Sequence, residues 1–285
     1  MATFLMCRPT YYGIEYEINP WMSVQRPADN ARALAQWERL VQVLTEDIGA
    51  EIKLVEPVPG LPDMCFTANA GFACGGMVVP SRFRYPQRQG EEPHFERWFR
   101  DNGFELRPLP ACRRDDSTDA PCFEGAGDAL PCAGRVYAGY HYRTDIRSHA
   151  DLGDIIGAEV LSLGLADRHF YHIDTCFCPL DGDAAMYYPP AFDEYARTVL
   201  RARLGDLIEA PPDDARDFGC NAVVVRRHVV LNEPCTELGR ALEAQGYHPH
   251  YVDLSEFIKA GGSAKCLTLR LDEPKWGVTW SPAVP

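Results

Sequence analysis

Helical patterns alternate with short apolar runs along this chain, and a glycine stands at five of the boundaries. Apolar residues recur at helical spacing in five segments, which are residues 29–48, 93–102, 148–156, 193–204 and 236–245. A glycine follows each segment: Gly49, Gly103, Gly157, Gly205 and Gly246. Glycine adopts the left-handed conformation beyond a helix end without a Cβ penalty, so we predict that each of the five closes a helix.

Residue types at the helix starts and between the helices support this pattern. Asp29 or Asn30 is placed to cap the first helix, and Pro93 stands where a first-turn residue belongs in the second. The runs between helices are rich in Val, Ile, Tyr and Phe and are bounded by Gly, Pro and Asp, which indicates strands. We expect strands within residues 133–140, 222–232 and 265–271.

The five glycines are separated by 54, 54, 48 and 41 residues. A period of about 50 residues indicates a repeated helix-and-strand unit. Such units without a linker predict a mixed α/β protein with a single domain over residues 1–285. We expect five units in a cyclic arrangement, which would direct equivalent loops and strand ends at one axis. An open doubly wound sheet is the alternative.

One polar residue follows each glycine at a similar distance. The offsets of 20, 21, 15, 16 and 20 residues lead to Asn69, Glu124, His172, Asn221 and Cys266. Singly, each has an ordinary explanation as a buried or turn-forming residue. If the units are related by rotation, however, these side chains meet near the axis, and together they indicate an active site.

A thiol, an imidazole and a carboxylate form a chemically useful set. The thiolate of Cys266 is a nucleophile, and the glycine pair at 261–262 lets its loop approach an electrophilic carbon. His172 can protonate a leaving amine and then activate water, and Glu124 can fix its tautomer. In an expected strand, His172 and Asp174 are two residues apart and share one face, so Asp174 is a further candidate.

Charge and cysteine content narrow the function. The chain has 41 acidic and 28 basic residues and a formal net charge of −13, which argues against nucleic acid and anionic membranes as partners. We find no secretory leader and no apolar run long enough to span a membrane. We therefore expect a soluble, cytoplasmic protein whose 11 cysteines are reduced. The cysteines lack zinc-site spacing, so we expect no metal and no other cofactor.

Four motifs follow one another along the chain: FEGAGD with Glu124, GYHYRT with Arg143, HIDTCF with His172, and GGSAKCLT with Cys266. They resemble the Glu-Gly-Gly-Asp, Gly-x-x-x-Arg-Thr and His-x-Asp motifs and the cysteine loop of the guanidine-modifying enzymes, the pentein superfamily. The resemblance covers nearly the whole chain. It implies a five-bladed α/β propeller, the arrangement that the glycine period also favours.

The resemblance implies three catalytic residues. Cys266 would attack a guanidinium carbon and form a covalent intermediate. His172 would carry protons to the leaving ammonia and from the incoming water, and Glu124 would pair with His172.

The resemblance also implies a small guanidino substrate, such as arginine or a derivative, and it is compatible with a homo-oligomer. Arg88 and Arg143 would hold the α-carboxylate of the substrate, because a planar guanidinium binds a carboxylate through two hydrogen bonds. Arg82 and Arg84 are alternatives to Arg88. Asp174 would accept hydrogen bonds from the substrate.

Asn69, in the segment FTANA, departs from part of the family. Deiminases and dimethylaminohydrolases usually carry Asp at this place, whereas the dihydrolases carry Asn. Asn can donate an N–H to the carbonyl oxygen of a ureido product, whereas an ionised Asp would face that oxygen with a second acceptor. Asn69 therefore favours an enzyme that hydrolyses the same carbon twice.

The N-terminal segment CRPTYYGIEYEINPWM resembles the opening of the arginine dihydrolase module of longer proteins, which would place Asn19 in the substrate site. A capped turn that packs Trp21 into the core is compatible with the same residues. We predict a hydrolase that converts L-arginine to ornithine, two ammonia and carbon dioxide. The alternatives are a one-step dimethylarginine dimethylaminohydrolase or arginine deiminase that gives citrulline, an amidinotransferase, and a non-catalytic amino-acid-binding module.

Overall fold

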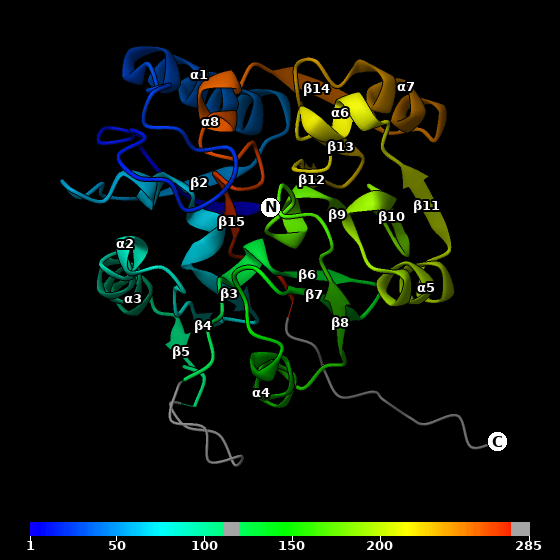
Figure 1. Cartoon of the computed structure of the whole chain (residues 1–285), viewed down its shortest axis with the longest axis horizontal. Helices are drawn as coiled ribbons and strands as arrows, with labels where there is room; N and C mark the ends of the chain where they lie inside the picture. The colour runs from blue at the N-terminus through cyan, green and yellow to red at the C-terminus, as the bar shows by residue number, and fades with distance from the viewer. Residues whose placement is uncertain (111–119, 275–285) are drawn as a thin grey trace.

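The strands of the described residues form five separate sheets of three strands each. The structure is a computed structural model, and it describes residues 1–110 and 120–274. Figure 1 shows the sheets following one another around the middle of the molecule, with the helices outside them. The architecture is a mixed α/β fold of five repeated units. The alternative of one open doubly wound sheet is therefore wrong for the described residues.

All five sheets have the same internal order. The middle strand pairs with one neighbour in antiparallel and with the other in parallel orientation. A parallel pair needs a crossover connection, and a helix supplies it in each unit. The sheets are β15 (Leu269–Arg270), β1 (Thr3–Cys7) and β2 (Glu51–Val55); β3 (Gly71–Cys74), β4 (Met77–Pro80) and β5 (Glu105–Leu106); β6 (Ala129–Cys132), β7 (Arg135–Tyr140) and β8 (Val160–Gly164); β9 (Phe177–Pro179), β10 (Ala184–Tyr187) and β11 (Asp206–Glu209); β12 (Val223–Val225), β13 (His228–Asn232) and β14 (His248–Val252).

The crossover helices are the five that the sequence predicts, and their ends agree with the prediction to within a few residues except at the first, which ends early. They are α1 (Asn30–Gln42), α3 (Glu92–Asp101), α4 (Arg147–Ile156), α5 (Glu194–Arg203) and α7 (Thr236–Ala244). Three short helices accompany them: α2 (Pro86–Gln89), α6 (Pro212–Arg216) and α8 (Ser255–Ile258). None of the described helices is both long and apolar enough to cross a membrane.

Local sequence explains how two of these helices begin and end. The Asp29 carboxylate caps α1 by accepting a hydrogen bond from the N–H of Arg32 at 3.0 Å, as predicted. Pro93 lies in the first turn of α3, also as predicted. The first predicted helix extends to residue 48, but α1 ends at Gln42 and gives way to a π-helical turn at Val43–Asp47.

Four of the five boundary glycines have the predicted left-handed conformation. The φ angles of Gly49, Gly103, Gly157 and Gly246 are 78°, 81°, 68° and 81°. Gly205 is the exception, because α5 ends at Arg203 and the next residue, Leu204, already has extended backbone. A Cβ on Gly205 would lie 2.9 Å from the carboxyl carbon of Asp183, so close approach rather than a helix cap explains this glycine.

Two strand predictions need correction. Residues 133–140 and 222–232 contain strand β7 and the hairpin β12–β13 as expected, but only Leu269–Arg270 of the segment 265–271 is a strand. The segment of His172 and Asp174 is not a strand either, since Ile173–Thr175 forms a 3-10 turn. The two side chains therefore do not share a strand face.

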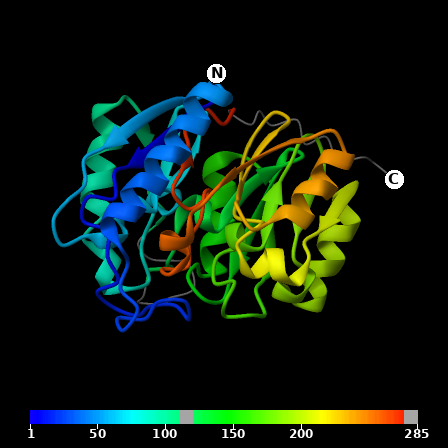
Figure 2. The same ribbon diagram turned by 90° about the horizontal axis from the view of Figure 1, so that it is seen from above.

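The first and last strands of the described chain pair with each other. Leu5 of β1 is opposite Leu269 of β15 in antiparallel register. This pairing places Cys266, which precedes β15, beside the N-terminal unit. Figure 2 shows the loop of residues 8–29 on the face of the molecule opposite the one where the N-terminus lies.

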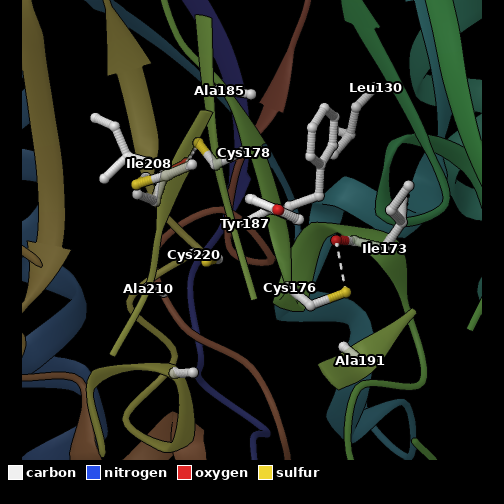
Figure 3. Packing of buried hydrophobic residues seen from close by; sticks show 14 of the residues in the cluster. Leu130, Ile173, Cys176, Cys178, Ala185, Tyr187, Ala191, Ile208, Ala210 and Cys220 are labelled. Carbon is white, nitrogen blue, oxygen red and sulfur yellow. Dashed lines mark hydrogen bonds between the residues drawn. The ribbon is translucent and has the colours of Figure 1, made fainter. Parts of the chain in front are cut away.

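The largest buried cluster lies between the sheets β6–β8, β9–β11 and β12–β14, and part of it is shown in Figure 3. Tyr187, Ile173 and Cys176 are at most 1% exposed there, and the thiol of Cys176 donates to the carbonyl of Ile173 at 3.5 Å. Nine of the ten cysteines of the described residues are buried. Packing thus accounts for most of the cysteine content.

Candidate active site

The five polar residues selected by their spacing precede the five strands that lie nearest the middle of the molecule (Figure 1). Asn69, Glu124, His172, Asn221 and Cys266 come before β3, β6, β9, β12 and β15. All five side chains are buried, with exposures of at most 2%. The structure brings them together, because hydrogen bonds join Asn69 to Glu124, Glu124 to His172, and Asn221 to Cys266.

One side chain, Asn221, holds the loop of Cys266. Its Oδ1 accepts the N–H groups of Ser263 at 3.0 Å and Cys266 at 3.1 Å. Its Nδ2 donates to the carbonyl of Asp174 at 3.0 Å and to Sγ of Cys266 at 3.1 Å. Both ends of the amide are bonded, so Asn221 fixes the position of the thiol. The sequence gives no indication of this role.

A buried carboxyl group lies beside the thiol of Cys266. The thiol donates to Oδ2 of Asp174 at 3.5 Å, and Oδ1 of Asp174 has no hydrogen-bond partner among the described residues. Burial raises the pKa of Asp174 to about 7, and the Lys265 ammonium only partly opposes this. Burial and Asp174 also raise the pKa of the Cys266 thiol well above its ordinary value. The thiol of the free protein is therefore protonated.

Glu124 is the centre of a second group. Its Oε2 accepts Nη1 of Arg143 at 3.0 Å and contacts Nε2 of His172 at 2.8 Å. Burial alone would raise the pKa of Glu124, but the Arg143 guanidinium and the hydrogen bond with His172 outweigh it, so this pKa lies well below its ordinary value. An ionised carboxylate can only accept, so Nε2 of His172 carries a proton and Nδ1 is free to exchange one.

Asn69 links this group to a buried ion pair. Its Nδ2 donates to the carbonyl of Glu124 at 3.2 Å, and its Oδ1 accepts Nη1 of Arg88 at 2.8 Å. The same guanidinium donates two hydrogen bonds of 2.8 Å to Glu91, and both side chains are at most 4% exposed. Arg88 thus already has a carboxylate partner in Glu91. Because Arg88 can only donate, it also fixes the Asn69 amide with Oδ1 toward the guanidinium.

The other candidate arginines differ in their partners. Arg82 donates to the carbonyl of Pro121 at 3.0 Å, and Arg84 donates to the carbonyl of Arg143 at 3.0 Å. Neither contributes to the cavity at Cys266, whereas Arg88 and Arg143 do. Of the three arginines near residue 88, the structure therefore places Arg88 at the site.

A small cavity of about 10 Å³ lies at the centre of these groups. This is room for about one water molecule, so the site of the free protein is closed. Its wall is formed by Asn19, Met22, Asp63, Phe66, Asn69, Arg88, Arg143, Tyr171, Ala260 and Cys266. Three candidate residues lie behind this wall. Glu124 is bonded to Asn69 and Asp174 to Cys266, and both of these partners line the cavity. His172 is bonded to Glu124.

Asn19 closes the cavity from the N-terminal loop. Its Oδ1 accepts the N–H of Trp21 at 2.9 Å, and its Nδ2 donates to the carbonyl of Ala260 at 3.0 Å. The Trp21 indole donates to the carbonyl of His169 at 2.7 Å and packs against Phe218 with ring centroids 4.9 Å apart. The segment is therefore both a capped turn and part of the cavity wall.

A larger hollow of about 640 Å³ lies next to the closed cavity. The two spaces share Asn19, Met22, Arg143 and Tyr171. These four side chains thus lie between the cavity at Cys266 and the hollow.

Two polar residues of the cavity wall, Asp63 and Tyr171, were not selected in the sequence analysis. Asp63 lines the cavity, accepts the hydroxyl of Tyr16 at 3.0 Å, and has a buried Oδ1 without a partner among the described residues. Burial raises its pKa. Tyr171 donates its hydroxyl to the carbonyl of Gly261 at 2.7 Å, and its ring lies 4.7 Å from the Arg143 guanidinium. Their only hint is that they are neighbours of Asn69 and His172 in sequence.

The assembled groups suit attack by a thiol and general acid–base catalysis. They comprise a buried thiol, an imidazole on an ionised carboxylate, an oriented amide, and two carboxyl groups with unbonded oxygens. Within residues 1–110 and 120–274, no group of three or more His, Cys, Asp or Glu side chains is placed to hold a metal ion.

Comparison with known proteins finds relatives along nearly the whole chain. The bifunctional arginine dihydrolase/ornithine cyclodeaminase ArgZ of Synechocystis is 45% identical over 281 residues, which cover 95% of this chain and 38% of that protein. The N(G),N(G)-dimethylarginine dimethylaminohydrolase of Mycobacterium tuberculosis is 42% identical over 268 residues, which cover 94% of this chain and 85% of the relative. No family model matches the chain. The chain thus spans well under half the length of ArgZ.

A solved structure shows the same arrangement in three dimensions. It is the N-terminal domain of ArgZ, an arginine dihydrolase from the ornithine-ammonia cycle in cyanobacteria, as a cysteine-to-serine mutant bound to substrate. Its TM-score is 0.89 at 43% sequence identity, and the match covers 96% of this chain and 99% of that domain.

Proposed function

The chain belongs to the guanidine-modifying, or pentein, superfamily, and from this premise we propose that it is an arginine dihydrolase. It would convert L-arginine and two water molecules to ornithine, two ammonia and carbon dioxide. The reaction is a hydrolysis of the C–N bonds of a linear amidine. Cys266 would be the nucleophile, and no cofactor is needed.

One observation carries this proposal. Cys266 and Asn69 line the same closed cavity, and Asn69 is bonded to the residue whose carboxylate holds His172. A nucleophile and an amide donor therefore line one cavity, and the acid–base group lies behind its wall, bonded to Glu124. The 45% identity to ArgZ and the substrate complex of its N-terminal domain support the same activity.

The first hydrolysis begins with ionisation of the thiol. A cationic guanidinium beside Cys266 would lower the thiol pKa that burial raises, and Asp174, at 3.5 Å, is placed to accept the proton. Sγ then bonds to the guanidinium carbon. A terminal C–N bond breaks, and an imidazolium at His172, stabilised by Glu124, gives its proton to the leaving ammonia. Water deprotonated by His172 replaces the thiolate and gives citrulline.

The second hydrolysis repeats these steps on the ureido carbon. Asn69 donates one Nδ2 hydrogen to the carbonyl of Glu124, so its second hydrogen is available for the ureido oxygen. Attack by Cys266 expels ammonia and leaves a carbamoyl group on sulfur. Water then releases a carbamate of ornithine, which loses carbon dioxide.

Substrate binding would use the remaining unbonded donors and acceptors. Arg143 donates to Glu124 and to the carbonyl of Ile18, so three of its five N–H groups remain for the α-carboxylate. Arg88 has one N–H left after its bonds to Glu91, Asp63 and Asn69, and its main contribution would be to orient Asn69.

Two further residues complete the proposed contacts. Asp174 would accept a guanidinium N–H through its unbonded Oδ1. Asn19 would close over the substrate from the N-terminal loop, as it closes the cavity of the free protein.

The same proposal extends to the whole chain. We infer a closed five-bladed propeller and a single catalytic domain over residues 1–285, and the pairing of β1 with β15 supports closure because it joins the two ends. A small guanidino substrate is the proposed partner. We also propose that the protein self-associates into a homo-oligomer. Its proposed location is the cytoplasm, where a catalytic thiol stays reduced.

Product analysis tests the activity. The reduced protein is incubated with L-arginine, and ammonia, citrulline and ornithine are quantified together. Two ammonia for each ornithine are expected, and Cys266→Ala should form none of the products. Citrulline as the final product would overturn the dihydrolase in favour of a one-step deiminase.

A second candidate is a dimethylarginine dimethylaminohydrolase. It is favoured by the Mycobacterium tuberculosis relative of that name, most of whose length this chain matches. That activity would release dimethylamine and citrulline from asymmetric dimethylarginine. Turnover of dimethylarginine with a higher kcat/KM than L-arginine would establish the second candidate and reject the first.

A further inference from the structure

A second cavity lies along the strands that follow the site residues. Its wall includes Phe177 and Val223 at the starts of β9 and β12, Pro179 and Arg270 at the far ends of β9 and β15, and Arg226 beyond β12. It shares no wall residue with the cavity at Cys266, although Lys265 in its wall directly precedes Cys266. Neither the proposed mechanism nor the substrate contacts use this cavity.

The cavity has the size and the wall of a small-molecule site. Its volume is about 260 Å³, just below the ~300–1,000 Å³ of sites for drug-sized ligands. Phe4, Leu130 and Phe177 form an apolar part of the wall. A ligand with one ring, or of similar size, would fill it.

The charges around this cavity are unbalanced in favour of cations. The wall contains Lys265, Arg226 and Arg270, and two carboxylates. Both carboxylates are engaged: Asp181 pairs with Arg227 at 3.4 Å, and Glu273 pairs with Arg270 at 3.5 Å.

Two of the cations have no such partner. Neither Lys265 nor Arg226 forms an ion pair with a carboxylate in the described part of the chain. The Lys265 ammonium has one hydrogen bond there, to the carbonyl of Ala126 at 3.4 Å. Lys265 is half-buried and Arg226 is exposed. In a chain with a net charge of −13, two such cations on one cavity wall suit an anionic ligand.

We propose that this cavity binds a small organic carboxylate and that its occupancy lowers the reactivity of Cys266. The carboxylate would lie between Lys265 and Arg226, and its apolar body would lie against Phe4, Leu130 and Phe177.

Lys265 connects the cavity to the thiol. It directly precedes Cys266, and its N–H donates to the carbonyl of Asn221 at 3.2 Å. Burial and Asp174 raise the pKa of the Cys266 thiol, and the Lys265 ammonium acts against both. A carboxylate paired with Lys265 would neutralise its charge, so the pKa of the Cys266 thiol would rise further and less thiolate would form. This second half of the proposal rests on Cys266 being the nucleophile, whereas the binding itself does not.

Binding is tested with three probes on the full chain at fixed pH and ionic strength. Para-fluorobenzoate supplies the carboxylate and the ring, inorganic phosphate supplies charge alone, and para-fluorobenzyl alcohol supplies the ring alone. Fluorine NMR and calorimetry follow binding to the wild type, to Arg226→Gln, and to a control, Arg216→Gln, which removes an exposed arginine of α6 outside the cavity. Saturable binding of the benzoate is expected, weakened about tenfold in Arg226→Gln and unchanged in the control.

The proposal is overturned if the benzoate does not bind at concentrations up to about 20 mM, or if both variants bind it equally. Phosphate or the alcohol binding as tightly as the benzoate would also contradict it, since charge or ring alone would then suffice.

Coupling to Cys266 is measured without any turnover. The rate of alkylation of Cys266 by iodoacetamide, read by peptide mass spectrometry, should fall about threefold with bound benzoate, the effect of ~half a pKa unit. This decrease should disappear in Arg226→Gln at the same benzoate concentration. An equal decrease in Arg226→Gln would mean that benzoate binds at the thiol itself, and an unchanged rate in the wild type would reject the coupling. A protein that binds benzoate but does not hydrolyse arginine would leave the cavity intact and reject only the proposed function.

Discussion

The orientation of Asn69 is set by partners that an aspartate cannot satisfy together. Arg88 can only donate, so Oδ1 of Asn69 faces it, and Nδ2 must then face the carbonyl of Glu124. Aspartate at this position would place a carboxylate oxygen against that carbonyl. Residue 69 therefore contributes a donor to the cavity, which a neutral ureido group needs and a guanidinium does not.

We expect Asn69→Asp to separate the two hydrolyses. The second step should slow about 30- to 150-fold more than the first, because a buried acceptor would face the ureido oxygen, which costs ~2–3 kcal/mol. Citrulline should then accumulate during arginine turnover, measured by amino-acid analysis over time. Asn102→Asp, at an exposed position, is the matched control. Equal slowing of both steps would show that Asn69 does not act on the ureido group.

The buried carboxyl of Asp174 should make stability depend on pH. Its pKa is raised to about 7 by burial from an ordinary value of 3.8. Below about pH 4 the group is protonated in both the folded and the unfolded protein and has no effect; as the pH rises to about 7, only the unfolded protein ionises freely, which destabilises the fold.

Asp174→Asn removes this penalty. Its free energy of unfolding relative to wild type should rise by a few kcal/mol between about pH 4 and pH 8, at ~1.4 kcal/mol for each unit of raised pKa. Urea unfolding across this range measures the difference, with Asp206→Asn, an exposed carboxylate, as control. A difference that does not change with pH would mean that Asp174 is ionised as readily as a surface group.

At the scale of elements, short turns rather than strands position the site. Asn69, Glu124 and His172 lie in or directly before the 3-10 turns Thr67–Ala70, Gly125–Gly127 and Ile173–Thr175. Hydrophobic periodicity can be recognised only over a longer segment, and these turns have only three or four residues. The sequence could therefore predict which segments carry the site but not their conformation, and the pairing of His172 and Asp174 on one strand face was wrong for this reason.

Gly127 in the second of these turns tests the tightness of this arrangement. A Cβ there would overlap Nδ2 of Asn69 and lie 3.4 Å from Nδ1 of His172. Gly127→Ala should lower kcat about 100-fold or more through displacement of these groups by ~1 Å, while a cooperative unfolding transition remains. Gly13→Ala is the matched control, since nothing lies within 4 Å of its added Cβ. Unchanged kcat in Gly127→Ala would show that the two side chains need not be held so closely.

At the scale of the whole molecule, the glycine period predicted five units and the segments that deliver their polar residues. It succeeded because each unit repeats one helix end and one strand start, which local sequence encodes. The glycine period does not predict the hydrogen-bond partners of these residues. The contacts of Asn221 with Cys266 and Asp174 and the unbonded oxygen of Asp63 arise only when segments far apart in the chain pack together.

The fate of the guanidine carbon tests the proposed double hydrolysis most directly. L-arginine labelled with a carbon isotope at this position alone is followed by NMR in one sample with the reduced wild-type protein. The labelled carbon should pass through at most a transient citrulline signal and end as bicarbonate, in amounts equal to the ornithine formed. Label that remains in citrulline at the end of the reaction would contradict a site that acts twice on the same carbon.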